Sequence, residues 1–146
     1  MDLRSGARLA QFMLQRQIGT GGMGTVWEAR DAESGAPVAL KILRIGDPSA
    51  AAVLRARLLR EAHATRLIAH PAIVPVLDVL DYEDSPVLVM DLLQGETLRQ
   101  KLIREGRLSV AETAQLLAPI AEALSVAHEA GIVHRDLKPE NIFIQG

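Results

Sequence analysis

The sequence contains no cysteine, and aromatic residues make up only 3% of the chain. The lack of cysteine excludes disulfide frameworks, thiolate zinc sites and cysteine nucleophiles, and it is typical of a reducing compartment, so we expect a cytoplasmic location. Strong charge of one sign is also missing, because the formal net charge is −2 at pH 7 with both signs interspersed. A basic stripe typical of nucleic-acid binding is therefore absent from the sequence, and we expect no nucleic-acid partner.

Long apolar runs are missing too. The first residues, MDLRSGARLAQF, lack the continuous apolar stretch of a signal peptide, and the most apolar region, Leu116 to Val133, is interrupted by charged residues and a histidine. We therefore expect a soluble chain without a membrane segment. With 146 residues and a hydrophobic fraction of 49%, the chain can bury one modest core.

The first part of the chain alternates short apolar segments with turn residues, which predicts strands. A three-stranded antiparallel meander and two further strands, five in all, are predicted at Phe12 to Ile18, Thr25 to Arg30, Pro37 to Leu43, Ile73 to Leu80 and Pro86 to Leu92. Between the meander and the later pair, Asp47 and Pro48 are typical of a helix start, and the alanine-, leucine- and arginine-rich run to about Ala69 continues as a helix.

The second part of the chain predicts two helices and a polar loop. Thr97 to Glu105 fits a short helix closed by Gly106, while Ser109 and Glu112 form a capping box for a longer helix that stops at Gly131. The final segment, GIVHRDLKPENIFIQG, has apolar ends around a dense polar centre. This pattern predicts a loop held between two short strands.

The glycine-rich segment IGTGGMGTV fits the pattern GxGxxG through Gly19, Gly21 and Gly24. A Rossmann loop would enter a helix at its third glycine, and a Walker loop would need lysine followed by serine or threonine, whereas here Gly24 leads into a strand-like run. What remains is a glycine-rich β-hairpin. It either lets backbone amides close over phosphates where a Cβ would clash, or it is merely flexible, and the glycines alone do not decide.

Two charged residues occupy positions that are costly for a lone charge. Lys41 lies in the body of a predicted strand, on the same side as Ala39. Glu61 falls at the centre of the apolar stripe of the following helix, where a carboxylate needs a cation, and Lys41 is the nearest candidate. The alternative is that the helix is rotated so that Glu61 faces water beside Arg57 as a surface pair.

The polar segment HRDLKPEN brings together Asp136, Lys138 and Asn141. A carboxylate can accept a proton, an ammonium can neutralise phosphate charge, and an amide oxygen can ligate magnesium, which are the parts that phosphoryl transfer needs. Taken alone, such a loop is more often a simple turn. The four histidines lack the local spacing of a zinc site, and we assign no metal to them.

In this order, the motifs resemble the protein kinase family, specifically the bacterial serine/threonine kinases of eukaryotic type. The matching segments are GTGGMGTV, VALK, a helix glutamate at Glu61, HPAIVPVLDV, VLVMDLL and HRDLKPEN, and they span nearly the entire chain. The resemblance implies an α+β fold with a kinase N-lobe, a five-stranded antiparallel sheet plus one helix, followed by the first helices and the catalytic loop of the C-lobe. The implied boundaries are an N-terminal extension over 1–11, the N-lobe to the hinge over 12–93, and a truncated C-lobe over 94–146.

The resemblance also implies roles for individual residues. Lys41 would hold the α- and β-phosphates of ATP and pair with Glu61, Asp136 would be the catalytic base, Lys138 would contact the transferred phosphate, and Asn141 would bind Mg²⁺. Val26 and Ala39 would pack on adenine, Met90 would be the gatekeeper, and Asp91 and Leu93 would offer backbone bonds at the hinge. The complete implied nucleotide-binding set is Ile18, Gly19, Thr20, Gly21, Gly22, Met23, Gly24, Thr25, Val26, Ala39, Lys41, Met90, Asp91 and Leu93.

The resemblance covers roughly the first half of a kinase domain, since the sequence stops at Gly146, before the aspartate-phenylalanine-glycine element. The expected activity is transfer of phosphate from Mg-ATP to serine and threonine of proteins, with no measurable transfer by the 146-residue chain alone. The long helix is expected to leave an apolar face uncovered and so to favour association. The competing interpretation is a non-catalytic nucleotide-binding or scaffold module, and dinucleotide binding is a distant third.

Overall fold

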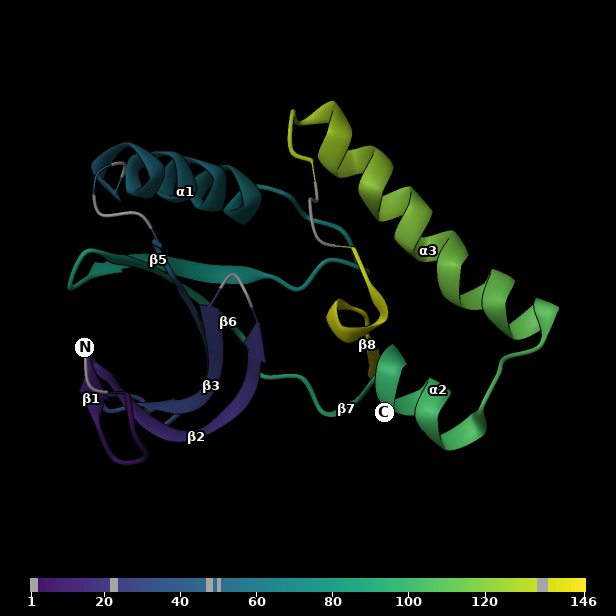
Figure 1. Ribbon diagram of the computed structural model, residues 1–146, viewed down its shortest axis with the longest axis horizontal. Helices are drawn as coiled ribbons and strands as arrows, with labels where there is room; N and C mark the ends of the chain where they lie inside the picture. Colours follow the sequence, from purple (N-terminus) through teal and green to yellow (C-terminus); the bar gives the residue numbers. More distant parts are fainter. Residues whose placement is uncertain (1–2, 22–23, 47–48, 50, 134–136) are drawn as a thin grey trace. The chain divides into compact units, whose positions relative to one another are not determined.

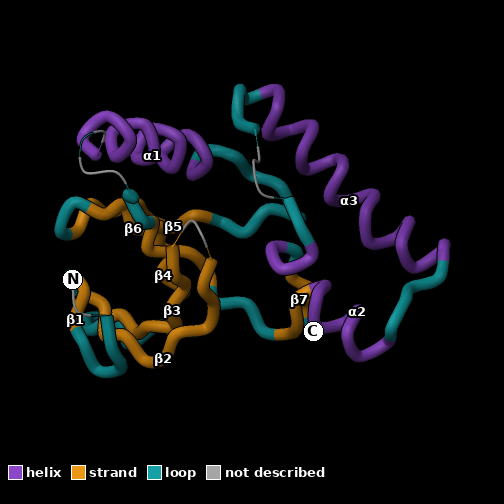
Figure 2. Tube along the Cα trace, viewed as in Figure 1, coloured by secondary structure: helices purple, strands orange, loops and turns teal. Residues whose placement is uncertain are grey.

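The computed structural model describes residues 3–21, 24–46, 49, 51–133 and 137–146. The chain divides into two compact units, one formed by Met1–Leu67 with Val74–Leu92 and the other by Ile68–Ile73 with Leu93–Gly146. Figures 1 and 2 show the first unit as a strongly curved sheet carrying one helix, and the second as two helices with a small ribbon of strands. No helix among the described residues combines the length and the apolar character that crossing a membrane requires.

An antiparallel sheet forms the body of the first unit, with the strand order β1-β2-β3-β4-β6-β5. Its strands are β1 (Arg8–Leu9), β2 (Phe12–Gly21), β3 (Gly24–Asp31), β4 (Pro37–Leu43), β5 (Val76–Tyr82) and β6 (Ser85–Asp91). The five predicted strands are confirmed, and β1 is an addition to the predicted sheet. It forms because the chain reverses at Ala10, whose φ is 51°, and so brings Leu9 opposite Phe12.

Alternation along the strands places a hydrophobic core on one face of the sheet. The buried members are Leu9, Phe12, Leu14, Trp27, Ala29, Val38, Leu40, Ile42, Val87 and Val89. Because successive residues point to opposite faces, Ala39 and Lys41 lie on the other face of β4 from Val38 and Leu40. The core therefore fixes which side of the sheet carries the predicted site residues.

Helix α1 (Ala51–Arg66) contacts β5 and β6. Ala62 is its only buried residue, so its apolar contact with the sheet is thin. The predicted start at Asp47 and Pro48 lies outside the described residues. The helix ends at Arg66, before the predicted end at Ala69, and Leu67 closes it by donating to the carbonyl of Ala64 at 3.1 Å.

Both helices predicted for the second unit are present, as α2 (Leu98–Glu105) and α3 (Val110–Glu129). Thr97 and Gln100 form a reciprocal capping box on α2, and Gly106 follows its last residue with a φ of 80°. Ser109 caps α3 by accepting from the backbone N–H of Glu112, but the Glu112 carboxylate binds the Ser109 hydroxyl, so only half of the predicted box forms.

Of the two short strands predicted around the polar segment, only the later one forms among the described residues. After it, the short 3₁₀ turn η1 (Pro139–Asn141) leads into β8 (Phe143–Gln145), which pairs with β7 (Gly95–Thr97). Before it, the predicted strand is wrong, because the N–H of Ile132 donates to the carbonyl of Ala127 at 2.9 Å and closes the end of α3. That backbone group is therefore unavailable to a sheet.

Candidate functional site

Three adjacent strands of the first unit bring four predicted site residues onto one face of the sheet. In the register of β3 with β4, Val26 stands directly opposite Lys41, and in the register of β4 with β6, Ala39 stands opposite Met90. Ala39 and Lys41 are two positions apart on β4 and share that face. Ala39 is buried, whereas Val26, Lys41 and Met90 are partly exposed, so the patch is mainly apolar, partly open and carries one ammonium group.

Two further side chains belong to this patch, and the sequence analysis missed both. Leu88 on β6 stands opposite Lys41, and Val76 on β5 stands opposite Met90. Counting alternate positions back from Met90 would have found Leu88. Val76 could not have been found in that way, because a register irregularity between Val76 and Asp78 shifts the pairing of β5.

The glycine-rich segment is a β-hairpin, as predicted. Strand β2 runs to Gly21 and β3 starts at Gly24, and these two glycines pair across the hairpin. Gly19 pairs with Val26, and Thr20 pairs with Thr25. Gly22 and Met23 lie outside the described residues. Ile18 is 42% exposed beside a second register irregularity, between Gln17 and Gly19.

The glycines of the hairpin differ in what requires them. A Cβ on Gly24 would lie 1.9 Å from the carbonyl oxygen of Ile42, and the φ of Gly24 is 144°, so the close approach of β4 requires glycine there. A Cβ on Gly21 would meet nothing within 4 Å, and Gly21 does not have a positive φ. Packing within the sheet therefore requires a glycine at position 24, whereas the space beside Gly21 is open.

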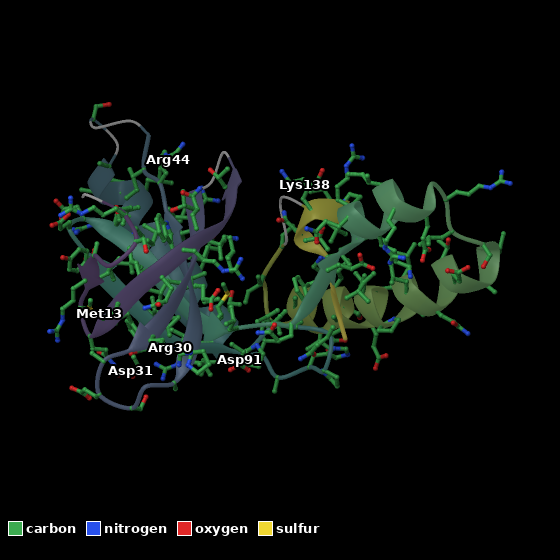
Figure 3. The ribbon with its side chains drawn as sticks, turned by 90° about the horizontal axis from the view of Figure 1, so that it is seen from below. Met13, Arg30, Asp31, Arg44, Asp91 and Lys138 are labelled. Carbon is green, nitrogen blue, oxygen red and sulfur yellow. The ribbon has the colours of Figure 1, made fainter. Side chains whose placement is uncertain are left out.

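The predicted hinge residues stand where the first unit ends. Asp91 is the last residue of β6, opposite Val38 of β4, and its side chain is exposed (Figure 3). Leu93 follows outside the strand and is partly buried.

Glu61 lies at the edge of the face of α1 that packs on the sheet, and not at its centre as predicted. Its side chain is 46% exposed and accepts a hydrogen bond from Nε of Arg57 at 3.2 Å. The sheet-facing positions of α1 are centred instead on Ala62, one residue further along. This is the surface pair with Arg57 that the sequence left as an alternative, while the pairing of Glu61 with Lys41 stays a prediction.

The predicted catalytic segment is described only in part, since Asp136 lies outside the described residues. Lys138 is exposed and directly precedes the 3₁₀ turn η1, in which the N–H of Asn141 donates to the carbonyl of Lys138 at 2.9 Å. This turn holds the two residues close together, and the Asn141 side chain is also exposed. Across the described ranges, no three histidine, aspartate or glutamate side chains gather as a metal site.

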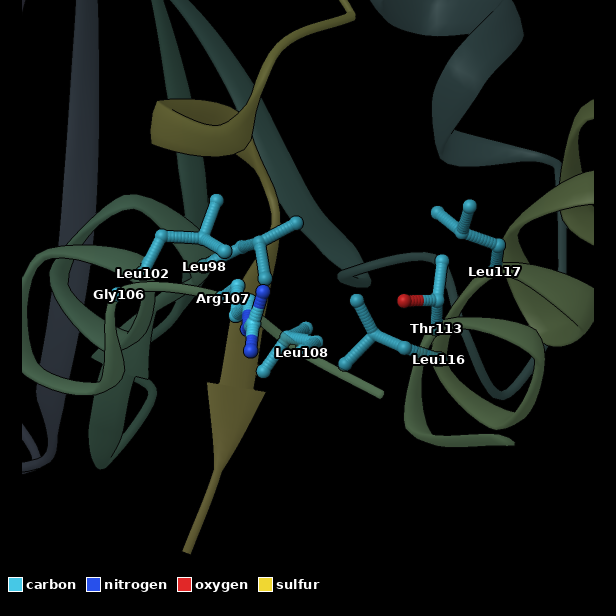
Figure 4. Close-up of a pocket in the computed structure, with 8 residues that line it drawn as sticks. All are labelled: Leu98, Leu102, Gly106, Arg107, Leu108, Thr113, Leu116 and Leu117. Carbon is cyan, nitrogen blue, oxygen red and sulfur yellow. The ribbon is translucent and has the colours of Figure 1, made fainter. Parts of the chain in front are cut away.

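A separate apolar hollow lies between α2 and α3 in the second unit (Figure 4). It is lined by Leu98, Leu102, Gly106, Arg107, Leu108, Thr113, Leu116 and Leu117. None of the predicted site residues lines it. Its walls are chiefly leucine side chains, without the convergent polar groups expected of a small-molecule site.

Known proteins match almost the whole chain. The protein kinase domain family matches residues 12–146. The serine/threonine-protein kinase PknA of Mycobacterium tuberculosis is 42% identical over 99% of this chain and 35% of its own length. The probable serine/threonine-protein kinase PknB of Corynebacterium glutamicum is 39% identical over 92% of this chain and 21% of its own length. The chain thus spans about a third or less of these curated relatives.

Solved structures match it as well. The crystal structure of the Mycobacterium tuberculosis PknI kinase domain has a TM-score of 0.82 at 30% identity, covering 99% of this chain and 60% of that one. The PpkA-294 apo form has a TM-score of 0.81 at 25% identity, covering 99% of this chain and 58% of that one.

Proposed function

The chain belongs to the protein kinase family, and from that membership we propose that the protein transfers the γ-phosphate of ATP to serine and threonine side chains of proteins. The observation that carries the proposal is the single sheet face on which Val26, Ala39, Lys41 and Met90 meet. An apolar patch beside one ammonium group suits a ligand with a flat apolar base and a charged tail, which is the shape of ATP.

Adenine would lie against the apolar part of this face. Val26 and Ala39 would offer side chains to one side of the ring, Met90 would bound the adenine site as the gatekeeper, and Asp91 with Leu93 would bond the ring edge through the backbone. Ile18, Thr20, Thr25 and the hairpin glycines would cover the nucleotide. The open space beside Gly21 supports this role, because the packing of the protein does not itself require a glycine there.

The charged groups would handle the phosphates. Lys41 would neutralise the α- and β-phosphates, and Glu61 would pair with its ammonium group and orient it. Asp136 would accept the proton of the substrate hydroxyl, and Lys138 would contact the transferred phosphate. These two residues act on developing charge, which is where a fixed cation or base gains most.

Asn141 fits a magnesium ligand by chemistry, since an amide oxygen is a hard donor and its side chain is exposed. When bound, Mg²⁺ supplies charge neutralisation at the phosphates. The ion usually takes one or two protein carboxylates together with phosphates and water, so Asn141 is one part of a larger ligand set.

The same proposal covers the domain boundaries, the location and the partners of the protein. We assign residues 12–93 to the N-lobe up to the hinge and 94–146 to the start of the C-lobe, with 1–11 as an extension. We place the protein in the cytoplasm, with ATP and proteins bearing serine or threonine as its partners. Exposed apolar side chains of the second unit, among them Ile103, Val110 and Leu117, favour association through that surface.

Nucleotide binding is tested by nuclear magnetic resonance on the 146-residue chain with a non-hydrolysable ATP analogue and Mg²⁺. We expect weak binding, with shifts concentrated at Val26, Ala39 and Met90. Lys41→Met should weaken binding about tenfold, or about 1.4 kcal/mol. Lys101→Met is the matched control, because Lys101 lies on α2 and pairs with Glu105. Equal binding by both variants, or shifts confined to the second unit, would contradict the proposed site.

Transfer itself is tested by following γ-phosphate incorporation into a generic protein substrate by the longest protein that contains this chain. We expect incorporation on serine and threonine that Asp136→Asn abolishes. If that protein binds Mg-ATP but transfers nothing, the non-catalytic nucleotide-binding or scaffold interpretation replaces the kinase one.

A further inference from the structure

Helix α1 is held on the sheet by little apolar contact. It contacts β5 and β6, yet Ala62 is its only buried residue, and Val53 on its outer side is 77% exposed. Burial of apolar area is what normally fixes a helix against a sheet. For α1 the rotation about its axis and the position along the sheet therefore depend on other contacts.

Arg55, near the start of α1, provides one such contact. Its Nη1 donates to Oδ2 of Asp81 at 3.1 Å and to Oδ1 of Asp84 at 2.8 Å. Asp81 lies near the end of β5, and Asp84 lies in the turn between β5 and β6. One guanidinium nitrogen thus bridges two carboxylates on one hairpin through charge-assisted hydrogen bonds.

The turn that carries Asp84 adopts a demanding backbone. Tyr82 pairs with Ser85, leaving a two-residue turn in which Glu83 and Asp84 have φ values of 47° and 63°. Such turns favour asparagine and glycine, and two acidic residues there have an energetic cost. The bond to Arg55 gives that cost a compensating interaction and directs the Asp84 carboxylate toward α1.

Arg66, the last residue of α1, provides a second contact. Its Nη1 lies 3.5 Å from Oδ1 of Asp78, near the other end of β5. Arg55 and Arg66 are about three turns apart, so they lie on the same side of the helix. The two arginines therefore fasten opposite ends of one helix face to one strand.

This geometry determines where Glu61 stands. At about 100° per residue, Glu61 lies about 120° around the helix from Arg55 and about 140° from Arg66, while Ala62 lies about 20° from Arg55 and about 40° from Arg66. We propose that Arg55 and Arg66 are positioning residues that set the rotation of α1 and thereby decide whether the Glu61 carboxylate faces Lys41 or the solvent beside Arg57. The proposal rests on the proposed function for its catalytic consequence, but the placement of the helix can be measured without it.

The contacts act together and not singly. The side chains of Arg55 and Asp81 are 31% and 39% exposed, and those of Arg66 and Asp78 are 45% and 47% exposed, so each pair alone is screened by solvent. If one pair is removed, the other still holds its end of α1 on β5. Removing both leaves α1 with only its thin apolar contact.

The structural test uses spin labels, for which the cysteine-free chain is well suited. Cysteines are placed at the exposed positions Ala56 on α1 and Glu33 in the turn after β3, and the distance between the labels is measured by pulsed electron resonance. We expect one narrow distribution for the parent. In Arg55→Ala with Arg66→Ala it should shift or widen by at least about 3 Å, twice the rise per helical residue.

Two further variants separate position from folding. Arg60→Ala is the matched control, because Arg60 is an exposed arginine of α1 without an ion pair among the described residues, and it should leave the distribution unchanged. In the Arg55→Ala background, Arg66→Asp combined with Asp78→Arg restores an attraction with reversed sign and should recover most of the parent distribution. An unchanged distribution in the double alanine variant, or an equal effect of Arg60→Ala, would overturn the proposal.

The catalytic consequence is measured in the longest protein that contains the chain. Arg55→Ala with Arg66→Ala should lower kcat about tenfold with KM for ATP changed less than about threefold, and Arg55→Lys should be intermediate, because lysine keeps the charge but not the planar guanidinium group. If the parent transfers phosphate and the double variant matches it, the positioning role is refuted. If the parent transfers nothing, the proposed function fails while the distance measurement still decides the placement of α1.

Discussion

Gly24 and Gly21 belong to the same hairpin, but the structure gives them opposite reasons to be glycine. At Gly24 a Cβ would stand 1.9 Å from the oxygen of Ile42, 3.0 Å from its carbonyl carbon and 3.1 Å from Cα of Leu43. All three are backbone atoms, so no side-chain rotation relieves the overlap. Gly24→Ala must therefore push β3 away from β4 at their shared end.

The expected loss has two parts. An L residue forced to the φ of 144° costs ~1–3 kcal/mol. Separating the strand ends gives up one or two ladder hydrogen bonds at about 1 kcal/mol each. The total of ~2–5 kcal/mol is a large share of the roughly 5–15 kcal/mol that stabilises an ordinary domain. With a urea slope of about 2 kcal/mol per molar, the unfolding midpoint should fall by about 2 M.

Gly21→Ala should behave differently. Because nothing lies within 4 Å of its Cβ position, the unfolding free energy should change by less than about 0.5 kcal/mol. If the space beside Gly21 accommodates phosphate, the same substitution should weaken binding of the ATP analogue at least threefold. Gly24→Ala should then lower stability, and Gly21→Ala should weaken ATP binding without lowering stability.

Trp27 provides the stability assay. It is the sole tryptophan of the chain, it is 5% exposed on β3, and its fluorescence should report unfolding of the sheet in urea. Equal midpoints for Gly24→Ala and the parent would refute the reasoning from close approach. If Gly21→Ala instead binds the analogue as tightly as the parent, the result favours the interpretation of the hairpin as a merely flexible turn.

Three other predictions concern stability. Leu40→Ala, at a side chain with no exposure in the core, should cost ~2–5 kcal/mol in the same urea experiment, whereas a cost below about 1 kcal/mol would mean that the sheet face is not packed as described. Thr97→Ala removes the acceptor for the N–H of Gln100, 3.1 Å away, and should lower the unfolding free energy by ~0.5–2 kcal/mol, with local hydrogen exchange in α2 rising most. The backbone N–H of Glu33, bonded at 2.8 Å, holds the pKa of Asp31 below its usual value. The stabilisation of the folded state by the ionised Asp31 is therefore present above the unfolded pKa and is lost as pH falls through the folded pKa. A titration of the carboxyl groups should find a lowered pKa for Asp31. Asp31→Asn should remove this part of the acid dependence of stability.

The strands and caps were accessible from sequence because their causes are local. Alternation along Pro37 to Leu43 follows from the pleat, and it correctly predicted that Lys41 shares a face with Ala39. Helix α2 begins after Thr97 and ends before Gly106, as predicted, and both ends are fixed by hydrogen bonds made within a few residues. The kinase fold and family predicted from the motifs are also confirmed.

Pairings set by distant parts of the chain were not accessible in the same way. The partner of β8 is β7, far back in the sequence, and Gly95 at its start pairs with Gln145. Nothing in the residues before the polar loop indicates that the N–H of Ile132 is already used by α3. The addition of β1 likewise depends on Ala10 adopting a positive φ, which its side chain does not favour.

The orientation of α1 is the clearest case of a property that composition leaves open. Alanine and arginine make up much of the helix, so its apolar residues only weakly favour one rotation. The rotation is set by charges on β5 and its turn, 26 and 29 residues away from Arg55. A carboxylate whose placement depends on such exposed pairs can be moved at small energetic cost. The sheet face with Lys41 is by contrast fixed by a buried core, so the helix is the part of this site whose position a change in salt or charge should alter first.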